Sequence, residues 1–533
     1  MYNNYTPLQQ RQLAQQEYSN TQSTYLLVCA PARSTALKAT LTDQLHRKFR
    51  MVDRLGGELT ASVDGVLLAA EDVELMSTAL MFFAKALQDG ADYAVCNAVF
   101  GFGGATALYQ SQPLQAQNRC AVVSRVLLER CRAAAHDPEN VPELLALAAQ
   151  LCTRPTLIPQ ALLHYERGIC AEDAFSAHGK RAFIMSHVLD MTGAPIVLVS
   201  AVPVLRSMGY EVLVLGPSDG GSLQLFLDAG ASVITRSSCR NVSDAWGMAL
   251  CADFVIANTV VMARAVRALS GTAVPVLWWL HDAFAGYPHI AHQIPTQLGE
   301  NVRVYSVGSH AANAMRAVRP EFEIRPLIYG LPDYAAENFV RTDLGYNRGR
   351  PLFATVGSFE RRKGHDIFCK AIRLLPPEVR EKASFLFVGQ AADKEMMDSV
   401  RALTADYPEN VYYCKRLTRD EIKSLMEQCT GLVCASRDDP MPTFVTEGLI
   451  FGKPSIVSEH TGTAGLISEG RNGFVYHNDD PQQLAVLLEH AIEHPEELAS
   501  MRTECRKMYE QYYSKEAFEQ TLRAAVEDLT AKK

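Results

Sequence analysis

The sequence predicts an α/β protein built from doubly wound parallel sheets. From about residue 25 to residue 505, short apolar runs alternate with segments of helical pattern. Several runs, such as "DFVIAN", "VPVLWWLHD" and "PLFATVGSF", are apolar throughout, as parallel strands covered on both faces require. The chain has 533 residues, which is enough for about three or four domains. Alternating strands and helices of this kind form open sheets with helices on both faces.

The alternation divides the chain into five parts. A polar tail over 1–24 lacks the basic start and apolar core of a signal peptide. Three α/β blocks follow at 25–175, 176–340 and 341–505, and a charged helical segment covers 506–533. Two such blocks in tandem place a cleft between the carboxyl ends of their strands, where open α/β sheets bind ligands.

Composition narrows the class of partner. A net charge of −8 argues against a general nucleic-acid binder. No apolar stretch approaches the roughly 18 residues that span a bilayer, so we expect a cytoplasmic protein whose membrane contact, if any, is peripheral at the inner face. The 13 cysteines form no CxxC pair and no zinc spacing, which predicts buried thiols in a reducing compartment and no metal site.

The stretch "TVGSFERRKGHD" is the first candidate site. A strand is predicted at 352–356, followed by Gly357 and by the basic residues Arg361, Arg362 and Lys363. Glycine lets the backbone approach a ligand closely, and cations at the carboxyl end of a strand suit a diphosphate. The alternative is a solvated basic loop.

The stretch "DDPMPTFVTEGLIFGKPSIVSEHTG" is the second candidate. Pro442 suits the first position of a helix, and the amides of Thr443, Phe444 and Val445 would then form an anion site at the helix mouth.

Acidic side chains flank the same helix. Glu447, one turn into the helix, has a carboxylate that accepts two hydroxyls, as a ribose diol offers, and Asp439 is placed to reach a sugar hydroxyl. The alternative is that Asp438 and Asp439 only cap the helix.

Two further stretches belong to the second block. "WWLHDAF" ends a strand with His281 and Asp282, and a strand-end histidine facing the cleft can hydrogen-bond a sugar hydroxyl. "LDMTGAP" contains Gly193 in a turn. The alternatives are a structural histidine and an ordinary loop.

Over about 178–530, these motifs resemble the GT-B glycosyltransferases of family 4, the retaining kind. "GSFERRKGHDIFCKAI" is similar to the phosphate loop of the family, and the stretch that begins at Asp438 resembles its E-x7-E element. "RNGFVY", "DDPQQLAVLL" and "VLWWLHD" fit further family motifs in the expected order. The resemblance implies two Rossmann-like domains facing a cleft, a last helix that crosses back to the first of them, and an additional N-terminal α/β accessory domain.

The resemblance also implies roles. Lys363 and Arg362 would hold the donor diphosphate, Glu447 the nucleotide ribose, and His281 the donor sugar. Base recognition in such domains relies largely on backbone near 389–390 and 413–417. The residues expected to bind the donor are Gly193, Gly357, Ser358, Arg361, Arg362, Lys363, Gly389, Asp439, Pro442, Thr443, Phe444, Val445 and Glu447, and those expected to act in catalysis are His281, Lys363, Asp439 and Glu447.

The sequence departs from the family pattern at three places. Asp439 stands where the first glutamate is usual, giving D-x7-E. Ser358 stands where arginine often follows the first glycine, so Arg361 or Arg362 would take over its role. The double glycine of the loop near 190 is reduced to Gly193-Ala194.

The block at 25–175 has a fainter similarity to GT-A glycosyltransferases of family 2, which bind a divalent metal through D-x-D. Here the corresponding stretch is Ala69-Ala70-Glu71-Asp72. The resemblance implies a truncated, inactive module that docks or positions the acceptor; the alternative is an unrelated accessory domain.

The expected function is transfer of a sugar, with retention, from a nucleotide diphosphate sugar to a hydroxyl of a glycan, lipid-linked or protein acceptor in bacterial polysaccharide or glycoprotein synthesis. No metal and no cofactor are expected. One alternative is a catalytically silent relative that binds an active glycosyltransferase. Another is a different GT-B enzyme, such as an epimerase or a phosphorylase.

Overall fold

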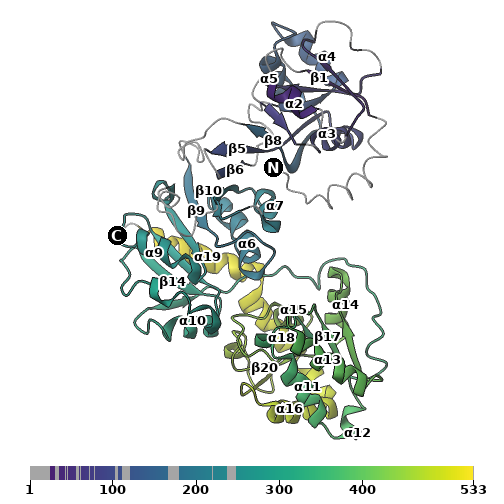
Figure 1. The fold of residues 1–533 in the computed structure, drawn as a ribbon, viewed down its shortest axis with the longest axis vertical. Coiled ribbons are helices and arrows are strands. Elements are labelled where there is room, and N and C mark those ends of the chain that lie inside the picture. The colour runs from purple at the N-terminus through teal and green to yellow at the C-terminus, as the bar shows by residue number, and fades with distance from the viewer. Residues whose placement is uncertain are drawn as a thin grey trace. The chain divides into compact units, whose positions relative to one another are not determined.

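The protein is described from a computed structural model (Figure 1). It divides into two compact units, Met1–Val255 and Ile256–Lys533, and each is described by itself. This division falls within the predicted block 176–340, whose boundaries remain predictions. The structure describes residues 24–29, 35–41, 44, 46–55, 59, 62–70, 73–76, 78–102, 106–110, 120–165, 179–218, 220–236 and 248–531. Residues 1–23 of the predicted tail and the pair Glu71-Asp72 lie outside these ranges.

A mixed sheet forms the first part of unit 1. Strand β1 pairs in parallel with β2 and β3, and β7 pairs antiparallel with β3 and β5. Strand β5 also pairs with β6, antiparallel, and with β8, parallel. Strand β8 in turn pairs antiparallel with β4. The strands are β1 (Leu26–Cys29), β2 (Phe49–Val52), β3 (Gly65–Ala69), β4 (Val73–Leu75), β5 (Tyr93–Phe102), β6 (Thr106–Gln110), β7 (Cys120–Ser124) and β8 (Pro155–Tyr165).

Both faces of this sheet are covered. Leu67 packs in one hydrophobic cluster and its neighbours Val66 and Leu68 in another, because successive side chains of a strand point to opposite faces. The helices are α2 (Thr35–Leu41), α3 (Ala79–Gln88), α4 (Arg125–Ala134) and α5 (Val141–Leu151). Ser124 caps α4 by accepting a hydrogen bond from the Leu127 amide, as a serine at this position commonly does.

A parallel set of strands completes unit 1. β9 (Lys180–Met185) pairs with β10 (Tyr210–Gly216), which pairs with β11 (Ser232–Arg236). The connecting helices are α6 (Gly193–Ser207) and α7 (Gly221–Asp228), and the short turn η2 covers Met248–Cys251.

Unit 2 begins with strands in the order β15-β14-β13-β12, in which β14 pairs in parallel with both β13 and β15. These are β12 (Phe254–Asn258, which the unit boundary crosses), β13 (Val276–Leu280), β14 (Val302–Ser306) and β15 (Ile324–Pro326). Their helices and turns are η3 (Val260–Met262), α9 (Ala263–Leu269), η4 (Phe284–Gly286), η5 (Ala291–Gln293) and α10 (Ser309–Arg316). We call residues 256–330 the first half of unit 2.

A six-stranded parallel sheet follows, in the order β18-β17-β16-β19-β20-β21. The strands are β16 (Leu352–Val356), β17 (Ser384–Val388), β18 (Val411–Cys414), β19 (Gly431–Cys434), β20 (Ser455–Ser458) and β21 (Gly473–Tyr476). The helices and turns are η6 (Arg361–Lys363), α11 (His365–Leu374), α12 (Pro377–Arg380), α13 (Lys394–Asp406), α14 (Arg419–Gln428), α15 (Thr443–Ile450), η7 (Ala464–Leu466), α16 (Pro481–Glu493), α17 (Pro495–Ser500) and α18 (Arg502–Met508). We call residues 351–508 the second half.

The chain ends in helix α19 (Lys515–Thr530), after the π-helical turn η8 (Tyr509–Tyr513). Phe518 of α19 stacks on Trp279 of β13, with ring centroids 5.8 Å apart, so the last helix packs on the first half of unit 2. Among the described residues, no helix is both long and apolar enough to cross a membrane. The predicted α/β class, with parallel sheets of the Rossmann type and an additional N-terminal mixed sheet, is confirmed.

Candidate functional site

In the six-stranded sheet, the order in which the chain adds strands reverses between β16 and β19. From β16 the chain adds β17 and β18 on one side, and it then returns to place β19 on the other side. Open α/β sheets bind ligands at the carboxyl ends of the strands at such a switch point. The loop after β16 carries Arg361, Arg362 and Lys363, and the loop after β19 leads to α15. The two stretches selected from the sequence therefore lie at one edge of one sheet.

The first of these loops approaches the second without space for a side chain. Gly364 has φ +65°, and a Cβ at this position would lie 1.8 Å from the carbonyl oxygen of Ala435. Glycine meets both requirements, since it tolerates positive φ and has no Cβ. Gly389, at the end of β17, approaches the carbonyl of Gly357 equally closely. The three glycines pack the strand ends together at the backbone level.

An ion pair joins the two predicted motifs. Lys363 Nζ lies 2.6 Å from Asp439 Oδ2, and their side chains are 18% and 4% exposed. The other carboxylate oxygen of Asp439 accepts a hydrogen bond from the Met441 amide at 3.2 Å. Asp439 is therefore bound within the loop and faces the lysine, rather than standing alone at the mouth of the helix.

The start of α15 differs from the prediction by one residue. Pro442 is the N-cap, and Thr443 is the first helical residue. The amide of Val445 donates to the Pro442 carbonyl at 3.1 Å, so the prediction that it points out of the helix mouth is wrong. A tight first turn causes this, because an i→i+3 hydrogen bond uses the third amide. The amides of Thr443 and Phe444 remain at the open end.

Glu447 has a partner that the sequence did not indicate. Its carboxylate lies 2.7 Å from Nη1 of Arg419, whose guanidinium stacks 4.2 Å from the centre of the Tyr334 ring. The Glu447 side chain is 12% exposed. Arg419 follows the N-cap of α14, so the contact joins two separate helices and fixes the direction of the carboxylate.

Arg437 supports the basic loop by hydrogen bonds to the backbone of that loop. Its guanidinium makes two hydrogen bonds of 2.8 Å to Asp366 and one of 2.8 Å to the Arg361 carbonyl, and its amide donates to the Arg362 carbonyl at 2.7 Å. Burial opposes ionisation of Asp366, but the hydrogen bonds and charge of Arg437 prevail and lower its pKa to about 2. Sequence reasoning missed Arg437, because its partners lie about 70 residues away.

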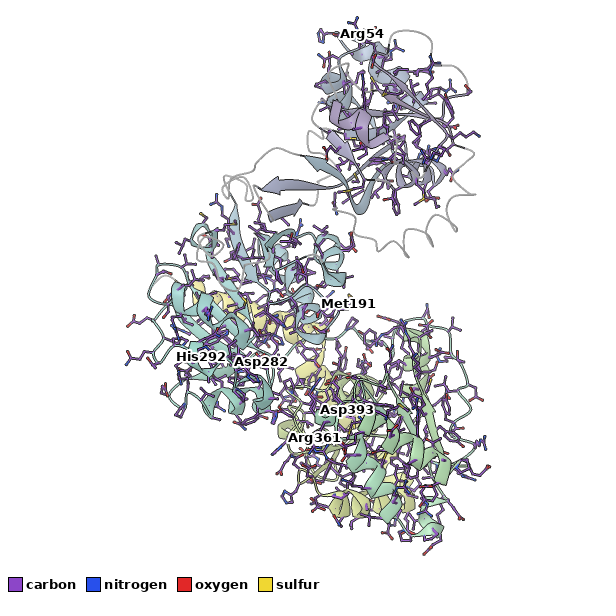
Figure 2. The ribbon with its side chains drawn as sticks, viewed as in Figure 1. Arg54, Met191, Asp282, His292, Arg361 and Asp393 are labelled. Carbon is purple, nitrogen blue, oxygen red and sulfur yellow. The ribbon has the colours of Figure 1, made fainter. Side chains whose placement is uncertain are left out.

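The remaining basic-loop residues make local contacts. Ser358 Oγ donates to Glu360, and Arg362 Nε lies 2.9 Å from the same carboxylate. The Arg361 side chain is exposed; Figure 2 labels it in this loop. Ser358 and Arg362 thus share Glu360 as a partner, whereas the side chain of Arg361 is exposed to solvent.

His281 and Asp282 follow β13 in the first half of unit 2 (Figure 2 labels Asp282). The His281 ring lies 4.7 Å from the ring of Trp279. Asp282 accepts a hydrogen bond of 2.5 Å from the Val260 amide, and burial raises its pKa to about 6. Asp282 is therefore a structural link between β13 and the turn after β12.

Gly193 belongs to unit 1. It is the first residue of α6, after the N-cap Thr192, and a Cβ built on it would have no heavy atom within 4 Å. Within unit 1, no steric contact therefore requires a glycine at position 193.

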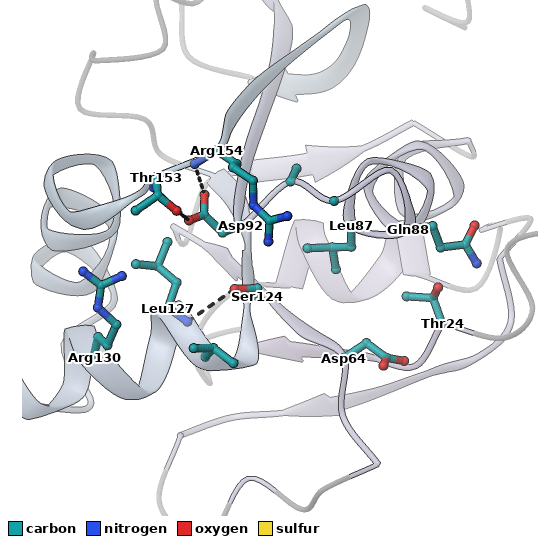
Figure 3. Close-up of a pocket in the computed structure, with 13 residues that line it drawn as sticks. Thr24, Asp64, Leu87, Gln88, Asp92, Ser124, Leu127, Arg130, Thr153 and Arg154 are labelled. Atoms are coloured by element: carbon teal, nitrogen blue, oxygen red, sulfur yellow. Dashed lines mark hydrogen bonds between the residues drawn. The ribbon is translucent and has the colours of Figure 1, made fainter.

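Unit 1 has a cavity of about 410 Å³, shown in Figure 3. It is lined by residues that precede β1, β3, β5 and β8, and so lies at the amino ends of these parallel strands. Asp92 in this cavity accepts hydrogen bonds from the amides of Thr153 and Arg154, both at 2.8 Å. The carboxylate holds the turn before β8, and the cavity lies at the sheet edge opposite to the one that binds ligands in open α/β folds.

Two models of known families match the chain. Residues 178–318 match the model described as "Glycosyl-transferase family 4", and residues 337–508 match "Glycosyl transferases group 1". Residues 178–318 and 337–508, the segments that these models match, belong to the glycosyltransferases of family 4. Their GT-B fold, predicted from the sequence, is confirmed. The GT-A similarity of the N-terminal block stays a prediction.

Two curated relatives and several solved structures are similar to the chain. An uncharacterized glycosyltransferase of Methanocaldococcus jannaschii is 25% identical over 194 residues, or 36% of this chain and 53% of the relative. Spore coat protein SA of Bacillus subtilis is 26% identical over 28% of this chain and 41% of the relative. The chain thus spans about half the length of the curated relatives it matches.

Among solved structures, HepE of Anabaena in complex with UDP has a TM-score of 0.54 at 18% identity and covers 66% of this chain and 100% of its own. WaaG, a glycosyltransferase involved in lipopolysaccharide biosynthesis, has a TM-score of 0.51 at 17% identity, with the same coverage. At these identities the likeness concerns the fold.

Proposed function

We propose that this family 4 protein transfers a sugar, with retention, from a nucleotide diphosphate sugar to an acceptor hydroxyl. The observation that carries the proposal is the contact between Lys363 and Asp439, which brings two motifs 76 residues apart to one switch point beside a helix mouth. A lysine, two arginines and the open amides of α15 are chemically suited to a diphosphate, which carries negative charge and many acceptor oxygens.

The reaction breaks the bond between the anomeric carbon and the diphosphate oxygen, and it forms a bond from the acceptor oxygen on the same face of the sugar. The hydroxyl proton passes to the departing phosphate oxygen. Negative charge grows on the diphosphate during this step, and cations held in place beforehand stabilise it. Lys363 would supply this charge, and we propose that no metal is needed.

The remaining residues divide between binding and positioning. Glu447, held by Arg419, would accept the two ribose hydroxyls, and Asp439 would hold Lys363 in its rotamer. Arg437 would keep the Arg361 and Arg362 carbonyls in place. His281 would contact the donor sugar. Solved structures of HepE contain UDP or UDP-glucose, so these two are the first ligands to test. A role in bacterial polysaccharide or glycoprotein synthesis is part of the proposal.

Calorimetry with UDP and UDP-glucose tests the site. Glu447→Gln keeps the size of the side chain but removes its charge, so donor affinity should fall by about tenfold or more, roughly 1.4 kcal/mol. Glu427→Gln is the matched control, because Glu427 is exposed and pairs with Arg341 away from the switch point. Turnover with a panel of acceptors, with and without EDTA, tests catalysis and the proposed independence of metal.

The outcomes separate the candidate functions. Equal donor affinity and turnover in Glu447→Gln and wild type would contradict the site. Failure of the wild type to bind any nucleotide sugar would favour the silent binding partner. Binding without transfer to any acceptor, but with rearranged or phosphorolysed product, would favour an epimerase or a phosphorylase.

A further inference from the structure

Asp438 connects the two halves of unit 2. It lies in the loop between β19 and α15, and its carboxylate accepts hydrogen bonds from the amides of Phe284 at 3.1 Å and Ala285 at 2.8 Å. A third comes from Nε2 of His310 at 2.7 Å. The Asp438 side chain is only 14% exposed. Its role as a helix cap, the alternative considered from the sequence, does not account for these three partners, which all lie more than 120 residues away.

The three donors suit a charged acceptor. Phe284 and Ala285 open the turn η4, where successive amides point the same way and favour an anion. Burial raises the pKa of Asp438, but His310 and the two amides outweigh burial, so this pKa lies below its usual value. Hydrogen bonds to an ionised acceptor are about twice as strong as neutral ones. Asp438 is thus held as a carboxylate.

The partners of Asp438 are themselves fixed by packing. The His310 ring lies 5.1 Å from the ring of Phe284 and 5.8 Å from the ring of His460. His460 belongs to the second half, and its carbonyl accepts a hydrogen bond from the Asp439 amide at 3.1 Å. Aromatic rings from both halves of unit 2 therefore surround the contact between Asp438 and His310.

The contact also lies between two predicted donor-binding residues. Asp439, which holds Lys363, is the next residue after Asp438, and Cα atoms of consecutive residues are about 3.8 Å apart. On the other side, Phe284 is the third residue after His281. A movement of Asp438 relative to η4 must change the spacing between the loop of His281 and the loop of Asp439.

We propose that Asp438 is a positioning residue that links the loop after β13 to the loop before α15. We call its three hydrogen bonds, from Phe284, Ala285 and His310, the clasp. This rests on the proposed function, in which His281 contacts the sugar and Lys363 the diphosphate. The clasp sets the distance between these two groups, so it acts on a ligand that spans both, the intact nucleotide sugar, more than on the nucleotide diphosphate alone.

The test uses the full chain with Asp438→Asn. An asparagine has the same shape, but it carries no charge and turns an NH2 group toward one of the three donors. We expect hydrogen exchange of the Phe284 and Ala285 amides to become about tenfold faster, affinity for UDP-glucose to fall about tenfold, and affinity for UDP to fall less than about threefold. Asp406→Asn, an exposed carboxylate paired with Arg373, is the control and should match wild type in all three.

His310→Phe is the second variant, because it removes one donor but keeps a ring between Phe284 and His460. It should shift the same three measurements in the same direction by smaller amounts. Unchanged exchange at Phe284 and Ala285 in both variants overturns the clasp, whatever the protein binds. Faster exchange with equal losses for UDP and UDP-glucose, or with no loss, overturns the positioning role. If the wild type binds neither UDP and UDP-glucose nor any other nucleotide diphosphate and its sugar, the proposed function fails and so does the positioning role that rests on it.

Discussion

Single ion pairs in unit 2 join residues that are far apart in the sequence. Lys363 meets Asp439, Arg419 meets Glu447, and Arg437 meets Asp366. In each pair the carboxylate is largely buried, so removing one partner would leave a charge with poor solvation. These pairs hold each carboxylate in one orientation, which a site that recognises hydroxyls and phosphates requires.

The Arg437–Asp366 pair predicts a change of stability with pH. The folded pKa of Asp366, about 2, lies below the ordinary aspartate value of 3.8, so the stabilisation is complete well above pH 4 and is lost as the pH falls through about 2. Asp366→Asn should cost about 1 kcal/mol near pH 6, allowing for solvent screening, and about half of that near pH 3. Urea unfolding at several pH values measures this. A cost that does not change with pH would contradict the assignment.

At the scale of elements, the site depends on two loops that follow neighbouring strands. β16 and β19 pair directly, although 74 residues, 357–430, separate the end of β16 at Val356 from the start of β19 at Gly431. The η6 turn and the start of α15 then meet because Gly364 allows backbone contact with Ala435. The geometry of the loop that carries Lys363 thus depends on the order of the strands and on one glycine.

Gly364→Ala tests this contact. The alanine would combine a positive φ with a Cβ that overlaps the Ala435 carbonyl, so we expect a loss of about 2 kcal/mol or more of stability and weaker donor binding. Gly345→Ala is the matched control, since Gly345 has φ +69° and no atom within 4 Å of its Cβ position. It should cost about 1 kcal/mol and leave donor affinity unchanged. Equal effects of the two variants would show that φ alone decides.

At the scale of the molecule, the C-terminal segment holds unit 2 together. The chain passes from α18 through η8 to α19, whose Phe518 stacks on Trp279 of β13, and Arg325 pairs with Asp528 at 2.8 Å. Both stacked rings are almost fully buried. The last 16-residue helix is therefore part of the core around β13, the strand that carries His281.

Phe518→Ala tests this packing. Truncation of a buried phenylalanine costs about 3–5 kcal/mol, so unfolding of unit 2 should shift to lower urea concentration. Tryptophan fluorescence reports on this region, because two of the three tryptophans, Trp278 and Trp279, lie in β13. Leu374→Ala, at a side chain that is 50% exposed, is the control and should change stability by less than about 1 kcal/mol. An equally small effect of Phe518→Ala would contradict a structural role for α19.

Much of the fold and part of the site were accessible from the sequence because their signals are local. Continuous apolar runs mark parallel strands wherever both faces are covered, and β12, β13 and β16 lie where these runs predict them. The positions of Lys363, Asp439 and Glu447 came from motifs of a few residues each. The one-residue error at Pro442 and the engaged amide of Val445 arose because hydrogen bonding in the first turn is not encoded in those few residues.

The sequence by itself determined the class of fold, the order of its elements and the loops that carry charge, since each depends on residues close together in the chain. Only the tertiary structure decided which charges meet: that Asp439 faces Lys363, that Glu447 faces Arg419, that Arg437 supports the basic loop and that Asp438 reaches η4. The physical reason is that these contacts follow from the order of strands in the sheet and from packing between separate halves, and neither leaves a periodic or local pattern in the sequence.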